Sequence, residues 1–216
     1  MRSARNARVC FAVTSAVVTF GLVLQLILSM TKDHHDGLFG SRAKRLVVFF
    51  SFFTVLSNIS VAVTTGLLAR RLGRTSRWFN VARLDAIICI TVTGVVFHLA
   101  LADLQELTGW DQLADFLLHT LSPILCPLGW LVFGPRRRLD RAIVVRSVVG
   151  PLCWLAYALV LGSVLEDRHG NAYYAYPFMN VEHHGYAVAL LRCAIVAVLF
   201  LGLAFGALAL DHRLPD

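Results

Sequence analysis

The chain has 216 residues, of which 57% are hydrophobic and 15% are charged, and its mean hydropathy is +0.69. Lys and Arg outnumber Asp and Glu, so the formal net charge is +7 and the isoelectric point is about 9.6. This composition excludes an ordinary soluble globular protein, because long apolar segments take up most of the length. The polar connections are too short to form a nucleic-acid-binding fold, so we expect no nucleic-acid partner for the positive charge.

Six apolar segments follow one another along the chain, and each is long enough to cross a membrane as a helix. A bilayer core is about 30 Å thick and a helix rises about 1.5 Å per residue, so roughly 17 to 25 apolar residues span it. A soluble helix of this length would carry a polar face, which these segments lack. We predict an all-α polytopic membrane protein with one domain over residues 1–216 and helices at about 9–31, 46–69, 84–104, 113–134, 148–165 and 186–210.

Basic residues are concentrated on alternate connections between these segments. Fourteen of the twenty Lys and Arg residues lie in the amino terminus, after the second and fourth segments and in the carboxyl-terminal tail, whereas five lie in the opposite connections. Lys and Arg accumulate on the cytoplasmic side of membrane proteins, so we expect a cell-membrane protein with both termini in the cytoplasm. Membrane lipids are the expected partners of these arginine clusters, through their anionic head groups.

Strongly polar side chains inside the apolar segments indicate a functional site, since each one is costly in hydrocarbon. Along the chain they include Thr54, Asn58, His98, Asp115, His119 and Arg192. Counted inward from the outer helix ends, the two histidines and the arginine lie roughly 9 Å deep, and Thr54 lies about 12 Å deep. A common pocket requires such a shared depth on several helices, and His98 is a candidate supporting residue on this ground.

Thr54 and His119 are the candidate catalytic pair. A hydroxyl becomes a nucleophile when an adjacent base takes its proton, and neutral imidazole is the usual base. Asp115 lies one turn before His119 on the same helical face, where it can orient the ring. Asn58 and Arg192 are candidate donors to a developing oxyanion. The structural alternative is that the threonine bonds to the carbonyl one turn back and that the asparagine joins helices.

Two prolines predict a break in the fourth segment beside His119. Pro123 lacks an N–H group and crowds the carbonyl of His119, and Pro127 repeats the effect one turn later. Broken backbone at membrane depth is tolerated only against protein or a water-filled cavity. We therefore expect a cavity near His119, with a plain kink as the alternative.

The outer connections combine histidine with carboxylates, as in Asp33-His34-His35-Asp36 and again within residues 166–184. These residue types are zinc ligands, but no metal-binding spacing such as H-E-x-x-H occurs. We therefore predict that these histidines are solvated, with metal binding by the outer connections as the alternative, and we assign no metal ligand and no cofactor. The last outer connection is also rich in aromatic residues, and we expect it to cover the outer mouth of the bundle.

Three short motifs resemble the bacterial Pr6Pr family of integral membrane proteins. They are FFTVLSN at residues 52–58, HTLSP at 119–123 and YPFMNV at 176–181, within a similar six-helix layout. That family is similar in turn to the animal androgen-induced, FAR-type membrane proteins, which act as threonine hydrolases on fatty-acid esters of hydroxy fatty acids. The resemblance implies a nucleophile at Thr54, a base at His119, a fatty-acyl ester substrate and no established cofactor.

The sequence leaves three functions open. The first is an intramembrane hydrolase of lipid esters, the second a non-catalytic binding or transport protein, and the third a structural subunit whose polar residues join helices. Transporters usually show repeated halves with helices broken at corresponding positions. Here only the fourth segment carries an obvious break, so the hydrolase is favoured over a transporter. Nothing in the sequence indicates an oligomeric state.

Overall fold

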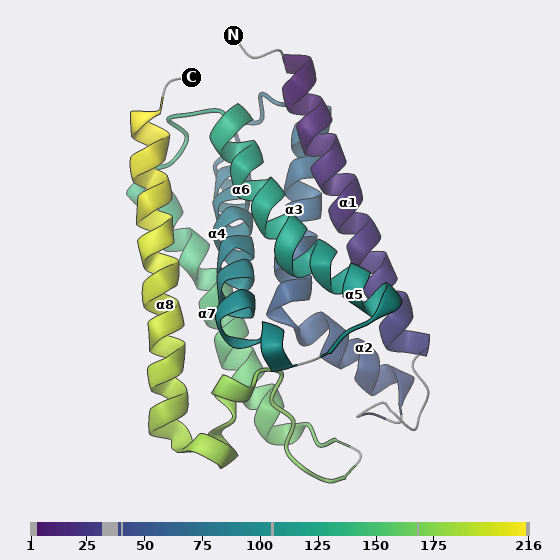
Figure 1. Cartoon of the computed structure of the whole chain (residues 1–216). Helices are drawn as coiled ribbons and strands as arrows, with labels where there is room; N and C mark the ends of the chain where they lie inside the picture. Colours follow the sequence, from purple (N-terminus) through teal and green to yellow (C-terminus); the bar gives the residue numbers. More distant parts are fainter. Residues whose placement is uncertain (1–3, 32–38, 40, 105, 168, 215–216) are drawn as a thin grey trace.

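The six apolar segments form a bundle of helices. The computed structural model describes residues 4–31, 39, 41–104, 106–167 and 169–214. Within these residues, six helices are long and apolar enough to cross a membrane. The chain runs up and down between them, so that both termini lie at the same end of the bundle (Figure 1). The protein is therefore a multi-pass membrane protein with an all-α fold, which confirms the fold class predicted from the sequence.

Most of the helices extend beyond the apolar segments at the end where the termini lie. An Arg-rich turn remains helical there, because arginine has a high helix propensity and its long side chain reaches the head groups. In chain order the elements are α1 (Ala4–Thr31), α2 (Arg42–Ser51), α3 (Phe53–Arg70), α4 (Arg77–Ala100), η1 (Ala102–Leu104), α5 (Gly109–Asp115), the π-helix η2 (Phe116–Leu121), α6 (Ser122–Phe133), α7 (Arg141–Val164), η3 (Pro177–Met179) and α8 (Val181–Arg213). Together α5, η2 and α6 make up the fourth crossing.

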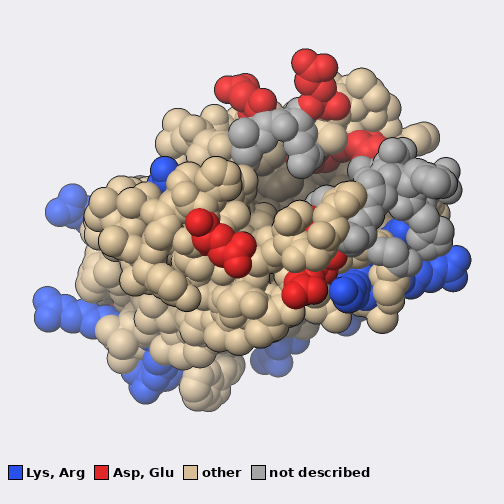
Figure 2. Space-filling view, turned by 90° about the horizontal axis from the view of Figure 1, so that it is seen from below, with Lys and Arg blue, Asp and Glu red and all other residues tan. Residues whose placement is uncertain are grey.

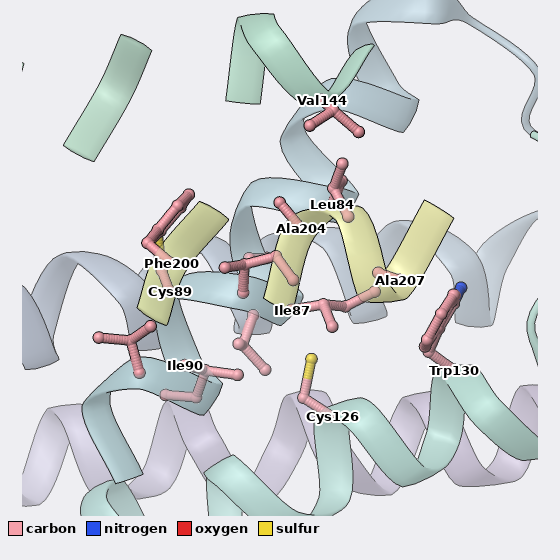
Figure 3. Packing of buried hydrophobic residues seen from close by; sticks show 14 of the residues in the cluster. Leu84, Ile87, Cys89, Ile90, Cys126, Trp130, Val144, Phe200, Ala204 and Ala207 are labelled. Atoms are coloured by element: carbon pink, nitrogen blue, oxygen red, sulfur yellow. The ribbon is translucent and has the colours of Figure 1, made fainter. Parts of the chain in front are cut away.

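The core of the bundle is centred on α4. Leu84 and Ile87 of α4 belong to one buried cluster with Cys126 of α6, Val144 of α7 and Ala204 of α8 (Figure 3). Around this core, many large apolar side chains on the outward faces of α1, α7 and α8 are exposed. Such faces are expected of helices that contact acyl chains in place of water.

Charge is distributed unequally between the two ends of the bundle. Figure 2 shows the end opposite the termini, where acidic side chains gather on the face and the visible Lys and Arg side chains lie toward its margin. The described part of this end includes α2 and the connecting residues 101–104, 106–108, 165–167 and 169–180. The arginine-rich connections at 71–76 and 134–140 lie at the other end, beside the termini.

The second crossing is interrupted, which the sequence did not indicate. We expected one helix over 46–69, but α2 ends at Ser51, Phe52 is extended with φ −67° and ψ 129°, and α3 begins at Phe53. Other elements pair the backbone groups freed by this break: Nε1 of Trp154 donates to the Ser51 carbonyl at 2.9 Å, and the Tyr176 hydroxyl accepts from the Phe53 N–H at 3.0 Å. The expectation that only the fourth segment is broken is therefore corrected. No proline or glycine marks this break, because its stability comes from partners distant in the sequence.

The fourth crossing is interrupted where the prolines predict it. The π-helix η2 lies directly before Pro123, which packs against α4 at Gly94. A Cβ atom added at Gly94 would lie 2.6 Å from the Cβ of Pro123 and 3.6 Å from the carbonyl oxygen of His119. The missing side chain therefore allows α4 and the broken helix to approach each other at the level of His119.

We predict that Gly94→Ala destabilises the bundle. The added methyl group has to displace Pro123, and overpacking of this kind costs about 1–3 kcal/mol of unfolding free energy. Gly202→Ala on α8 is the matched control, because nothing lies within 4 Å of a Cβ atom added there. The measurement is the thermal unfolding midpoint of each variant in detergent, and equal midpoints for Gly94→Ala and Gly202→Ala would contradict the packing argument.

Candidate functional site

Thr54 of α3 and His119 of η2 meet inside the bundle. Oγ1 of Thr54 lies 3.1 Å from Nε2 of His119, a hydrogen-bond distance at which the imidazole can accept the hydroxyl proton. Thr54 is buried, and the side chain of His119 is 20% exposed. The two residues that the sequence placed at similar depth are therefore also in direct contact.

Asp115 lies on the far side of the imidazole. Its Oδ1 is 2.8 Å from Nδ1 of His119. An ionised Asp115 favours a proton on Nδ1, which leaves Nε2 as the acceptor for the Thr54 hydroxyl. The Nδ1–H direction does not meet hydrogen-bond geometry with any described residue.

Phe97 of α4 holds the imidazole ring from one face. The rings of Phe97 and His119 are stacked, with centroids 4.1 Å apart and an interplanar angle of 13°. Stacking restricts rotation of the histidine side chain, because the flat ring has to stay parallel to its neighbour. The stacking fixes the plane of the imidazole, and Asp115 beside Nδ1 favours the orientation in which Nε2 faces Thr54.

The side chain of Asn58 on α3 donates hydrogen bonds to backbone carbonyls and does not line the cavity beside Thr54 and His119. In η2 the helical bonds reach five residues back, and the residue five positions after Leu118 is Pro123, which has no N–H. The Leu118 carbonyl therefore lacks a helical donor, and Nδ2 of Asn58 donates to it at 3.1 Å and to the Thr54 carbonyl at 2.8 Å. Because both amide hydrogens are used, we assign Asn58 a positioning role in place of the oxyanion-donor role expected from its sequence position.

His98 and Arg192 do not contact the pair of Thr54 and His119. His98 is exposed near the end of α4, where Nδ1 lies 2.8 Å from the Gly94 carbonyl and Nε2 lies 3.2 Å from the Thr120 hydroxyl. Arg192 is half-buried on α8 and makes no hydrogen bond or ion pair with the described residues. Its neighbour Cys193 lines the cavity and Arg192 does not. Counting residues gives depth along a helix, but direction around the helix depends on how it packs.

An apolar cavity of about 210 Å³ lies beside Thr54 and His119, as the break in the fourth helix predicts. Side chains of α3, α4, η2, α7, α8 and the segment 176–179 line it, and nearly all of them are aliphatic or aromatic. Leu152 of α7 and Leu201 of α8 are part of this wall and are also 53% and 41% exposed. The cavity therefore reaches the lipid-facing surface at α7 and α8.

Tyr176 is the site residue that sequence reasoning did not single out. It follows α7 in the last connection, is buried, and lines the cavity with Thr54 and His119. Its hydroxyl accepts from the Phe53 N–H at 3.0 Å, and the side chain and backbone of Thr54 also interact with the phenol. The signal available in the sequence is its place in the YPFMNV motif, which resembles a Pr6Pr motif and belongs to an aromatic segment, but to which we assigned no site residue.

Metal-ligand side chains do not converge in the described part of the chain. No group of three or more His, Cys, Asp or Glu side chains there is placed to hold a metal ion. His183 and His184 lie side by side with ring centroids 5.5 Å apart. The histidine pair at 34–35 and its flanking aspartates lie outside the described residues.

Comparison with known proteins finds no relative of this chain. It matches no family model, no curated protein and no solved structure. The resemblance to the Pr6Pr family therefore depends on the three motifs alone, and the functional argument depends on the geometry of the site.

We predict that Asn58→Leu lowers the unfolding free energy by about 1–3 kcal/mol, the cost of leaving a buried carbonyl without a donor. The carbonyl concerned belongs to Leu118, next to His119, so the variant should also lose activity at this site. Ser60→Ala on the same helix is the control, because the Ser60 hydroxyl makes no hydrogen bond with the described residues. The measurement is thermal unfolding in detergent, and a midpoint for Asn58→Leu equal to that of Ser60→Ala would contradict the positioning role.

Proposed function

We propose that the protein is an intramembrane hydrolase of lipid esters, with Thr54 as nucleophile and His119 as general base. The observation that supports this most directly is the 3.1 Å separation of Thr54 Oγ1 and His119 Nε2 at the wall of an apolar cavity. The carboxylate of Asp115 behind the ring completes the arrangement of nucleophile, base and orienting acid that activates hydroxyl groups in hydrolases. The motifs that resemble the Pr6Pr proteins contain the same threonine and histidine.

The proposed reaction has two steps, and both use the same proton acceptor. Thr54 Oγ1 attacks the ester carbonyl while Nε2 of His119 takes its proton, and the tetrahedral intermediate collapses to acyl-threonine as the alcohol leaves with that proton. Water then attacks the acyl group while His119 takes its proton. The bond from Thr54 Oγ1 to the acyl carbon breaks as His119 returns that proton to Thr54, and the carboxylic acid leaves. The side chains of His119 and Asp115 are 20% and 23% exposed, which gives water a route to the imidazole.

A lipid substrate fits the cavity better than a polar one. An apolar cavity of about 150 Å³ can hold a molecule the size of benzene, so the larger cavity here accommodates several carbons of an acyl chain. Leu152 and Leu201 bring its wall to the lipid-facing surface. We propose that the acyl chain enters from the bilayer between α7 and α8 and that its carbonyl stops beside Thr54.

The orientation in the membrane is a further part of the proposal. The end of the bundle that holds the termini carries most of the Lys and Arg residues, which favours its placement in the cytoplasm. The site then lies in the outer half of a cell membrane, on the side shown in Figure 2.

One observation favours a second candidate, a non-catalytic protein that binds or transports a ligand. Two interrupted helices, α2–α3 and α5–α6, meet at one polar pair inside the bundle, and transporters build ligand sites from interrupted helices. Ligand flux into proteoliposomes without any ester hydrolysis would favour this candidate. If Thr54→Ala and His119→Ala change neither ester hydrolysis nor ligand flux and affect only stability, the protein would instead be a structural subunit.

We predict that Thr54→Ala and His119→Ala each abolish ester turnover and covalent labelling by a fluorophosphonate probe. Removal of a nucleophile or its base lowers the rate by about 10⁴-fold or more, since the two groups act as a unit. The measurement is hydrolysis of p-nitrophenyl octanoate by the protein purified in detergent, together with in-gel detection of the probe. Asp115→Asn should retain labelling at a reduced rate, because the ring loses its orienting charge.

Thr65→Ala is the matched control for these variants. Thr65 is also buried on α3, and its hydroxyl bonds to backbone carbonyls of its own helix. Full turnover and labelling in Thr54→Ala, with the fold intact, would end the hydrolase proposal.

We also predict that Leu201→Trp slows hydrolysis of long-chain esters by blocking the lipid-facing side of the cavity. The matched control is Leu191→Trp, because Leu191 is 62% exposed on the same helix and does not line the cavity. The measurement is kcat/KM for p-nitrophenyl acetate and p-nitrophenyl palmitate. A loss that is confined to the palmitate supports lateral entry, and equal rates for the two variants would contradict it.

A further inference from the structure

The last connection places a phenol at the interruption between α2 and α3. Tyr176 is buried among aromatic rings, with centroid distances of 6.2 Å to Phe52, 5.8 Å to Trp154 and 5.5 Å to Phe178. Its hydroxyl oxygen accepts the Phe53 N–H, one of the first amides of α3, at 3.0 Å. Rings on several sides and a backbone bond at the tip fix the position of this hydroxyl to a degree unusual for a loop residue.

The Tyr176 hydroxyl keeps its proton, so it is a group that can donate a hydrogen bond. Burial raises the pKa of the phenol, although interactions with the Thr54 side chain and backbone and with the Phe53 backbone act in the opposite direction. The phenol oxygen accepts from the Phe53 N–H and also interacts with the side chain and backbone of Thr54. The amide also polarises the phenol, which strengthens the bond that its O–H can donate.

This hydroxyl lies where an ester carbonyl would have to stop. Tyr176, Thr54 and His119 line the same cavity, and the Thr54 side chain interacts with both the phenol and the imidazole. An oxygen that becomes charged during attack by Thr54 Oγ1 needs a donor beside that atom. Asn58 cannot serve, because both of its amide hydrogens are bonded to backbone carbonyls, and Arg192 lies outside the cavity wall.

We propose that Tyr176 is the oxyanion donor of this site, so that its O–H bonds to the carbonyl oxygen of the substrate as that oxygen takes up negative charge. The role depends on the hydrolase function proposed above. As Thr54 Oγ1 bonds to the carbonyl carbon, the carbonyl π electrons move onto the oxygen and the Thr54 proton moves to His119. Tyr176 stabilises this charge without transferring its own proton. When the carbonyl re-forms and the alcohol leaves, the charge on the oxygen is lost and the bond weakens.

The test compares two tyrosine-to-phenylalanine variants that each remove one hydroxyl beside the same interruption. Tyr176→Phe removes the proposed donor. Tyr157→Phe removes a hydroxyl that lies 2.7 Å from Ser51 Oγ at the end of α2 and does not line the cavity. For p-nitrophenyl octanoate in detergent, we expect kcat of Tyr176→Phe to fall by about 10²- to 10³-fold with KM nearly unchanged. Tyr157→Phe should keep the kcat of the unaltered protein.

A second readout separates the donor role from a structural one. The rate of Thr54 labelling by a fluorophosphonate should fall in Tyr176→Phe, because the attacked phosphoryl oxygen also gains charge. Should Tyr176→Phe fail to fold, Tyr176 can be replaced by 3-fluorotyrosine, which keeps the shape of the ring and changes the acidity of its O–H. We expect this replacement to change kcat. The same replacement at Tyr157 is the control and should leave kcat unchanged.

The outcomes distinguish the two proposals. Loss of kcat in Tyr176→Phe alone supports the oxyanion role. Thr54-dependent turnover that is the same in Tyr176→Phe and Tyr157→Phe overturns the oxyanion role and leaves the hydrolase proposal intact. Absence of any Thr54-dependent turnover or labelling in the unaltered protein overturns both.

Discussion

A backbone N–H or C=O group in hydrocarbon needs a partner, and this requirement shapes the centre of the molecule. Two crossings interrupt their helical bonding at the level of the candidate site. At the first interruption, Trp154 pairs with the Ser51 carbonyl and Tyr176 with the Phe53 N–H. At the second, Asn58 pairs with the Leu118 carbonyl. Polar side chains that would be costly alone in a membrane are therefore retained, because they complete the backbone bonding of broken helices.

The same interruptions bring the reactive groups together. The break at Phe52 places Thr54 in the first turn of α3, and the π-helix before Pro123 carries His119 to within 3.1 Å of it. Rigid neighbours then limit the motion of both side chains: α4 supplies the Phe97 ring that stacks on the imidazole, and threonine has few rotamers within a helix. A pair held in this way needs little reorganisation before a proton is transferred, which is the property expected of a catalytic site.

The surroundings of the pair determine which reactions are plausible. The cavity is apolar and reaches the lipid-facing surface through Leu152 and Leu201, and the side chains of His119 and Asp115 are partly exposed. The proposed ester of an acyl chain would therefore approach Thr54 through the cavity.

The sequence by itself determined the membrane setting, the six crossings, the break before Pro123, the similar depth of Thr54 and His119, and the place of Asp115 one turn before His119. These features follow from composition and from spacing along one helix, which are local properties. Only the tertiary structure decided that Thr54 faces His119 while Arg192 and His98 lie apart from them, that Asn58 serves the backbone, and that the second crossing breaks at Phe52. Each of these features depends on the rotation of a helix about its axis and on partners up to 123 residues away in the sequence. Both faces of a membrane helix are apolar, so the sequence has no clear period that separates the face toward lipid from the face toward protein.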